Sequence, residues 1–133
     1  MTVLSLFKPT KKKKSRRAYL IKALDDLVSK QVRERDGYTC RKCGRRAIKK
    51  NDVAHHHLMT KTRLATRWLL ENGISLCYFC HRSAHAAPEE FRNWILSWMP
   101  QAEYDQLYLW SQTRSGYKGK DLELLLWGMR RGK

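Results

Sequence analysis

The chain contains the segment Asn72-Gly73-Ile74-Ser75-Leu76-Cys77-Tyr78-Phe79-Cys80-His81, in which a short apolar run leads into a Cys-x-x-Cys knuckle and a histidine. An earlier knuckle, Cys40-Arg41-Lys42-Cys43, has the same spacing. Each knuckle presents two thiolates to one ion, so two knuckles supply the four ligands of a closed tetrahedral site. We therefore expect a structural Zn²⁺ bound by Cys40, Cys43, Cys77 and Cys80, whereas in an oxidising compartment the same cysteines could pair as disulfides.

The charge of the chain points to a polyanionic partner. Among 133 residues the formal net charge is +16 at pH 7, and 17 of the 28 Lys and Arg residues lie in residues 1–50. Residues 8–17 are mostly Lys and Arg and show no apolar periodicity. We therefore predict a flexible basic arm over residues 1–17 and a single domain over residues 18–133. Such a distribution favours nucleic acid as the partner.

Membrane and secretory proteins are not indicated by the sequence. No stretch approaches the roughly 20 apolar residues of a membrane span. The apolar segment Met1–Phe7 is too short for a signal sequence and lacks a small-residue cleavage site. We expect a cytoplasmic protein without a membrane partner.

Helical and strand periodicity outlines the elements around the knuckles. Apolar residues at helical spacing predict a helix over 18–35, which ends at Asp36-Gly37. Residues 52–58 contain His55-His56-His57 and are predicted to form a strand entering the site. A short helix or turn is expected at 66–70, a turn at Asn72-Gly73, and a further helix from near Cys80.

The C-terminal part, residues 88–131, is predicted to be helical. Pro88 and Pro100 each suit the first turn of a helix, and Asp121 suits the cap of a last one. These amphipathic segments carry tryptophans that we expect to pack in the core: Trp94, Trp98, Trp110 and Trp127.

Together, these motifs resemble the HNH endonucleases. The resemblance covers roughly residues 32–94 and includes the lead-in Arg35-Asp36-Gly37-Tyr38-Thr39-Cys40 as well as the second knuckle with His81. It is strongest to small phage or prophage members, which have similar segments around Thr66-Arg67-Trp68. The resemblance implies an α+β fold with a ββα-metal core over about residues 36–87, a four-cysteine zinc site, and flanking N-terminal and C-terminal helices.

The resemblance also implies a role for each histidine. A histidine bound to a metal cannot also activate water, so the ligand and the base must be different residues. By resemblance, His56 and His81 are catalytic-metal ligands, His85 completes that site, His57 is the general base, and Asn72 positions the base through a hydrogen bond. Three adjacent histidines also allow a second register, with His55 as the ligand and His56 as the base.

By this resemblance, the function is metal-dependent hydrolysis of DNA phosphodiester bonds, by nicking or double-strand cleavage. The implied cofactors are the structural Zn²⁺ and one divalent catalytic cation, which could be Mg²⁺, Mn²⁺, Ni²⁺ or Zn²⁺. A phage-encoded enzyme would act in the cytoplasm of its bacterial host, and a homodimer or a contact with packaging or recombination proteins is left open. Weak candidates for DNA contact are Lys61, Arg63, Arg67 and the run Lys11, Lys12, Lys13 and Lys14.

Two alternative functions need fewer of these residues. A non-catalytic zinc-ribbon protein that binds nucleic acid would require only the cysteines and the basic arm. A structure-selective nuclease that resolves DNA junctions would use the same paired knuckles, and dimerisation with a preference for branched DNA would support it.

Overall fold

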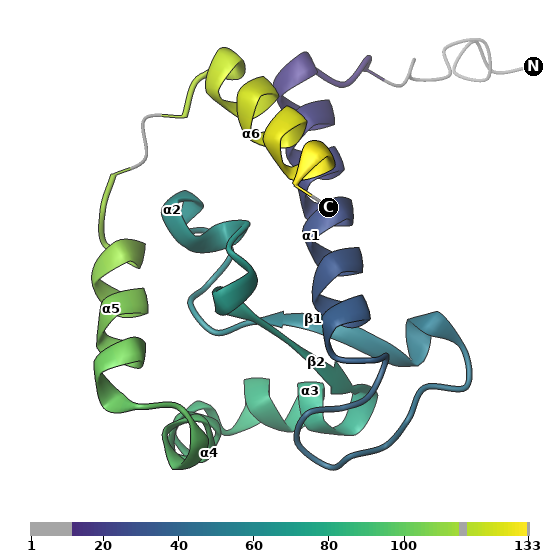
Figure 1. The fold of residues 1–133 in the computed structure, drawn as a ribbon, viewed down its shortest axis with the longest axis vertical. Coiled ribbons are helices and arrows are strands. Elements are labelled where there is room, and N and C mark those ends of the chain that lie inside the picture. Colours follow the sequence, from purple (N-terminus) through teal and green to yellow (C-terminus); the bar gives the residue numbers. More distant parts are fainter. Residues whose placement is uncertain (1–11, 115–116, 133) are drawn as a thin grey trace, which may run out of the picture.

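A two-stranded antiparallel sheet lies between two helices, α1 (Arg16–Arg35) and α3 (Tyr78–Ala86), in the computed structural model (Figure 1). The structure describes residues 12–114 and 117–132. The strands are β1 (Val53–His57) and β2 (Gly73–Cys77), and the fold is α+β. Short helices η2 (Lys50–Asp52), α2 (Leu64–Arg67) and η3 (Leu70–Asn72) connect the larger elements. Three further helices follow: α4 (Pro88–Trp98), α5 (Gln101–Ser111) and α6 (Gly119–Arg131).

Strand register determines which way each histidine points. In the β1–β2 pair, His55 lies opposite Ser75, His56 opposite Ile74, and His57 opposite Gly73. Because side chains alternate along a strand, His55 and His57 share one face of the sheet and His56 lies on the other.

Helix α1 is amphipathic, as its sequence predicts. Ser15 caps its N-terminus by accepting a hydrogen bond from the Ala18 backbone N–H, which starts the helix two residues earlier than predicted. Arg16 and Arg17 of the predicted arm are therefore helical, while residues 1–11 lie outside the described residues. The buried face of α1 packs against α6 and Trp68 to form one of two core clusters, which includes Leu20, Leu24, Val28, Val32, Leu122 and Leu126.

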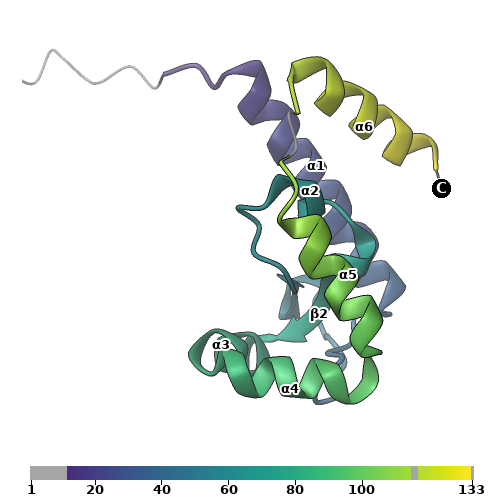
Figure 2. The same cartoon turned by 90° about the vertical axis from the view of Figure 1, so that its left-hand side faces the viewer.

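The second core cluster joins the sheet to α3, α4 and α5. Figure 2 shows α3 and α4 together below the sheet, with α5 rising beside it from the far end of α4. Burial of apolar side chains from each layer holds this arrangement, because the sheet and the helices each have one apolar face to cover. Its central members are Val53, Ile74, Leu76, Phe91, Ile95 and Leu107.

Three of the four tryptophans expected in the core are exposed. The exposed fractions are 41% for Trp98, 45% for Trp110 and 59% for Trp127, so their assignment to packing was wrong. Helical periodicity aligns apolar residues on one face but does not say whether another element covers that face. Trp68 is the tryptophan that is fully enclosed, at 6% exposure.

Two helix starts also differ from prediction. Asp121 is the third residue of α6, where its carboxylate accepts a hydrogen bond from the Lys118 backbone N–H, so it stabilises the start of the helix without being the cap residue itself. Helix α3 begins at Tyr78, inside the second knuckle, and so carries Cys80 and His81 in its first turn.

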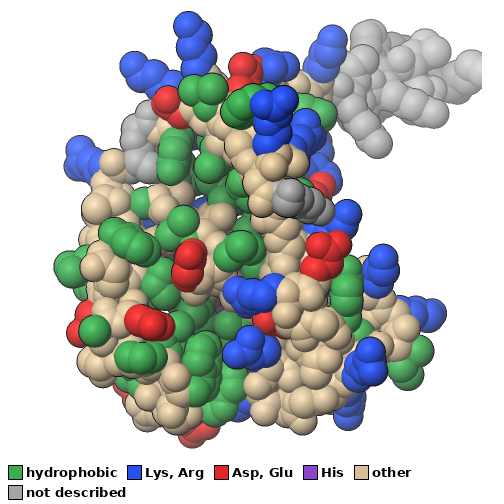
Figure 3. All heavy atoms as spheres, viewed as in Figure 1, with side chains coloured by type: hydrophobic (Ala, Val, Ile, Leu, Met, Phe, Trp, Pro, Cys, Tyr) green, Lys and Arg blue, Asp and Glu red, His purple; other side chains and the backbone are tan. Residues whose placement is uncertain are grey.

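Basic side chains are unevenly spread over the surface. In Figure 3 most Lys and Arg side chains lie over α1, the loop after it and α6, while few lie over α4 and α5. Within the described residues, no helix combines the length and the apolar character needed to cross a bilayer.

Candidate metal centres

The two knuckles bring all four cysteines together. Their sulfur atoms lie within 4.8 Å of one another, and the Cys43 and Cys77 sulfurs are 3.6 Å apart. Four sulfurs at about 2.3 Å from a central ion would be separated by about 3.8 Å, so the cluster has the dimensions of a tetrahedral zinc site. None of the cysteines is in a disulfide.

One thiol of this cluster is already acidic. Burial raises the pKa of Cys40, but backbone N–H groups of Cys43, Cys77 and Lys42 outweigh burial and lower it to about 7. The thiolate is the form that binds a metal, so these backbone donors favour the ligand state of Cys40. The residues present therefore fit zinc in number, spacing and chemistry.

Asp36 connects the first knuckle to the sheet. Its carboxylate accepts hydrogen bonds from the guanidinium groups of Arg35 and Arg41 and from the Ser75 backbone N–H, and its side chain is fully buried. Burial opposes ionisation of Asp36, but the donors from Arg35 and Ser75 lower its pKa overall. Gly44 closes the knuckle at φ +78°, a left-handed conformation that glycine adopts without strain.

A second cluster contains three histidines. The nitrogens of His56, His81 and His85 lie within 4.8 Å of one another, and the Nε2 atoms of His81 and His85 are 3.1 Å apart. His81 and His85 are four residues apart on α3 and so share a helix face, while His56 projects toward them from β1. Of the two registers that the sequence allows, the structure places His56, and not His55, with His81 and His85.

Burial favours the neutral form of two members of this cluster, His56 and His81. It lowers the pKa of His56 to about 4, with further lowering from the positive charges that His81 and His85 would carry. Burial and the proximity of His85 also lower the pKa of His81. A neutral imidazole is the form that binds a metal, so these three side chains are suited to hold a divalent cation.

His57 lies on the opposite face of β1 from His56. Burial lowers its pKa, while a hydrogen bond to the Arg67 backbone and the nearby Asp25 carboxylate act in the opposite direction. Its Nε2 is buried and has no hydrogen-bond partner among the described residues. A neutral imidazole with a free nitrogen can accept a proton.

His55 is packed into the protein. Its Nδ1 is 3.0 Å from the Ser29 hydroxyl on α1, and burial is the main cause that lowers its pKa to about 3. Gly73 permits this packing because a β-carbon at that position would overlap the His55 ring. The ring of His55 lies 4.2 Å from that of His57, centroid to centroid.

Asn72 acts on the chain after His57 instead of on the His57 ring. Its side-chain oxygen accepts a hydrogen bond from the Met59 N–H at 2.7 Å, and its amide nitrogen donates to the Met59 carbonyl at 3.1 Å. The expected hydrogen bond from Asn72 to His57 is therefore replaced by a pair of bonds to the backbone of Met59, two residues beyond His57. This pair fixes the turn that follows β1.

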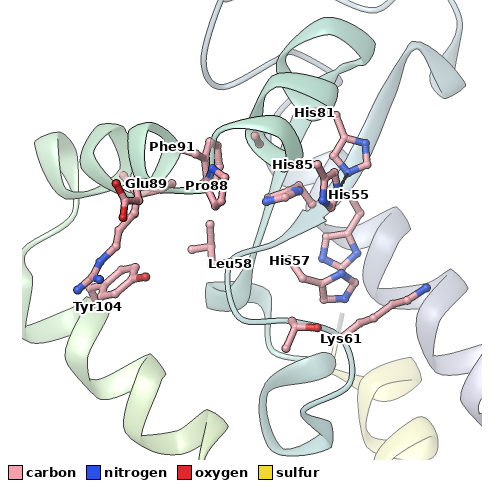
Figure 4. A pocket seen from close by; sticks show the side chains of 15 residues that line it. His55, His57, Leu58, Lys61, His81, His85, Pro88, Glu89, Phe91 and Tyr104 are labelled. Atoms are coloured by element: carbon pink, nitrogen blue, oxygen red, sulfur yellow. Dashed lines mark hydrogen bonds between the residues drawn. The ribbon is translucent and has the colours of Figure 1, made fainter.

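All five histidines line one pocket, which has a volume of about 790 Å³. Figure 4 shows His81 and His85 extending from α3 toward the strand, Lys61 near His57, and Glu89 and Tyr104 on the other side. The Phe91 ring contacts the His56 ring edge-on, at 4.9 Å between centroids, and the Arg92 guanidinium lies 5.2 Å from the Tyr104 ring. The pocket therefore carries one cation, Lys61, near His57 and another, Arg92, beside Tyr104.

Several residues in the pocket or close to His57 could not be found from local sequence patterns. Asp25 lies on α1, and Phe91 and Arg92 lie on α4, each outside the histidine and cysteine motifs. Only the amphipathic pattern of α4 placed Phe91 on a buried face.

The predicted DNA contacts differ in availability. Arg67 is held by Asp25 through two hydrogen bonds of 2.9 and 2.6 Å, with the Trp68 indole N–H donating to the same carboxylate. Lys61 and Arg63 are exposed, as are Lys12, Lys13 and Lys14, while Lys11 lies outside the described residues. The Arg67 guanidinium is thus engaged by Asp25, whereas Lys61 and Arg63 are available to contact DNA.

Comparison with known proteins gives no family assignment. The chain matches no protein-family model, no curated protein and no solved structure. The class established by the fold and the clusters is an α+β protein with a four-cysteine centre that could bind zinc and an adjacent three-histidine centre.

Proposed function

We propose that this protein is a metal-dependent DNA endonuclease of the HNH type. The observation that carries the proposal is the meeting of His56 from β1 with His81 and His85 from α3, next to His57 on the same strand. The order of an antiparallel β1–β2 pair followed by α3 supports it, because this is the ββα arrangement that the sequence resemblance implies. The four-cysteine cluster beside it provides a rigid support.

The proposed reaction assigns separate tasks to the two faces of β1. A divalent cation held by His56, His81 and His85 would stabilise the charge that develops on the scissile phosphate and the leaving oxygen. His57, which lines the same pocket, would accept a proton from the attacking water. Lys61 and Arg92 line the same pocket and can bind the flanking phosphates.

Burial has a consequence for the pH range of His57. Since its pKa is lowered below the ordinary value of about 6.5, His57 stays neutral at pH 7 and remains able to take up a proton. Asn72 contributes indirectly, by fixing the backbone at Met59 and hence the end of the strand that carries His57.

The test is cleavage of supercoiled plasmid by purified protein, with EDTA and with Mg²⁺, Mn²⁺, Ni²⁺ or Zn²⁺ added back. We expect cleavage that requires a cation and falls by at least about 100-fold in His57→Ala, as for loss of a general base. Gln106→Ala, a change at an exposed position on α5, is purified in parallel and should cut like the wild type.

Two outcomes would contradict the proposal. Cleavage at the wild-type rate by His57→Ala would show that His57 is not the base. The absence of cleavage with every cation, together with tight and salt-sensitive DNA binding, would favour the non-catalytic zinc-ribbon protein.

A further inference from the structure

A second groove lies beside the histidine pocket. Its volume is about 570 Å³, and it runs between the loop after the first knuckle and the start of α3. His81 lines both this groove and the histidine pocket, so the two are neighbours. A polymer bound in the groove could therefore extend past His81 into the histidine pocket.

Two aromatic rings stand at the α3 side of this groove. Tyr78 is 66% exposed and Phe79 is 65% exposed, although both belong to the knuckle whose cysteines are held inward. Both rings belong to the first turn of α3, whose backbone also carries Cys80 of the four-cysteine cluster. Exposed rings at this position offer flat surfaces on which another planar group can stack.

Two basic side chains, Arg45 and Arg46, line the groove together with these rings, and they belong to a basic segment. The segment of residues 41–50 contains six basic residues and no acidic one, and all six are exposed: Arg41, Lys42, Arg45, Arg46, Lys49 and Lys50. The Arg45 guanidinium lies over the Phe79 ring, 5.5 Å from its centroid. The acidic residue that lines the groove, Asp52, is occupied in accepting hydrogen bonds from the Ile48 and Lys49 backbone.

We propose that this groove binds an unpaired nucleotide of the DNA substrate. A base stacks on Phe79, with the Tyr78 ring edge-on to Phe79 beside it, and Arg45 and Arg46 hold its phosphates. Bases have a π-face regardless of sequence, so stacking beside a basic groove is the usual way in which proteins bind single strands. A protein partner would not need cations arranged around two solvent-facing rings, whereas a polyanion with planar groups needs both.

This inference rests on the proposed endonuclease function and names its substrate class: DNA with a single-stranded segment next to the cut. A strand that leaves the groove past His81 enters the histidine pocket directly. Single-stranded overhangs and flaps contain such segments, while a fully paired, blunt-ended duplex does not.

The experiment measures binding separately from cleavage. Fluorescence anisotropy with labelled single-stranded oligothymidine and with a duplex of equal length is recorded on full-length, zinc-loaded His57→Ala protein, with no divalent cation added. Phe79→Leu keeps an apolar side chain but removes the ring, and should weaken single-strand binding by about tenfold while changing duplex binding by less than about twofold. Phe79→Tyr keeps an aromatic ring and should bind the single strand as tightly as the protein with Phe79.

A matched control comes from α5. Tyr108 is also an exposed aromatic residue, and Tyr108→Leu should leave both affinities unchanged. Zinc content and circular dichroism of each variant verify that the knuckle is intact.

Equal weakening of single-strand and duplex binding by Phe79→Leu would overturn the stacking site. Single-strand binding unchanged by Phe79→Leu would overturn it as well. The proposed function fails separately: a protein that binds oligothymidine through Phe79 but cuts no DNA would lose the nuclease assignment and keep the groove.

Discussion

Replacing Asn72 with alanine should destabilise the protein strongly, although Asn72 is a small polar residue at the end of a short turn. Its side chain is fully buried and makes two hydrogen bonds to Met59, one to the backbone N–H and one to the carbonyl. Met59 is itself buried, so in Asn72→Ala both of its backbone groups lose their partner away from water.

The expected loss in the free energy of unfolding follows from the Met59 backbone N–H and carbonyl that lose their partner. A buried donor or acceptor left without a partner costs about 1–3 kcal/mol, so the pair gives about 3 kcal/mol in total. With a urea slope of about 1.5 kcal/mol per molar, the midpoint of unfolding should fall by about 2 M. Equilibrium urea unfolding, followed by tryptophan fluorescence with zinc present, measures this shift.

The matched control is Asn93→Ala. Asn93 is exposed on α4, so the same chemical change there should alter the free energy of unfolding by less than about 0.5 kcal/mol. If Asn72→Ala also changed the free energy of unfolding by less than about 1 kcal/mol, the backbone bonds at Met59 would not be what holds the turn after β1.

Three further predictions concern the supports of the two centres. Asp36→Asn should lower the free energy of unfolding by about 2 kcal/mol, because the partly exposed Arg35 and Arg41 lose a buried carboxylate, and urea unfolding measures it. Because the pKa of His55 in the folded protein is about 3, acidification from pH 7 to 5 protonates this histidine in the unfolded state and not in the folded one. His55 alone should therefore contribute about 2 kcal/mol to the loss of stability, and urea unfolding at the two pH values should show a loss smaller by about that amount in His55→Gln. Cys43→Ser should lower the zinc content and reduce the melting temperature by about 10 °C or more, read by metal analysis and calorimetry.

Much of the fold was predictable because its signals are local. The spacing of Leu20, Leu24, Val28 and Val32 marks α1 within two residues of its start. Each Cys-x-x-Cys spacing places its own two sulfurs together, and the four-ligand requirement of zinc predicts that the two pairs meet. The burial of α5 was not predictable in this way. Leu107 is buried while the next three residues are exposed, since only one side of that helix meets the core.

The candidate site was predictable where the chain itself sets the spacing. His81 and His85 share a helix face by their separation of four residues, and strand alternation separates His56 from His57. Asp25 reaches Arg67 across 42 residues, and no local pattern encodes that pairing. The Asn72 bonds to Met59 depend likewise on how the turn closes, so the sequence did not predict Met59 as the partner of Asn72.

The two centres are mechanically linked through α3. Cys80 belongs to the four-cysteine cluster, and the next residue, His81, belongs to the histidine cluster. Helix α3 has nine residues and begins inside the second knuckle, so the cysteine cluster fixes the first turn of the helix that carries two of the three histidines. An isolated helix of that length is marginal in water, and its direction depends on what anchors its ends. If His56, His81 and His85 bind a cation as proposed, loss of the cysteine site should therefore weaken that binding even though none of its ligands is a histidine.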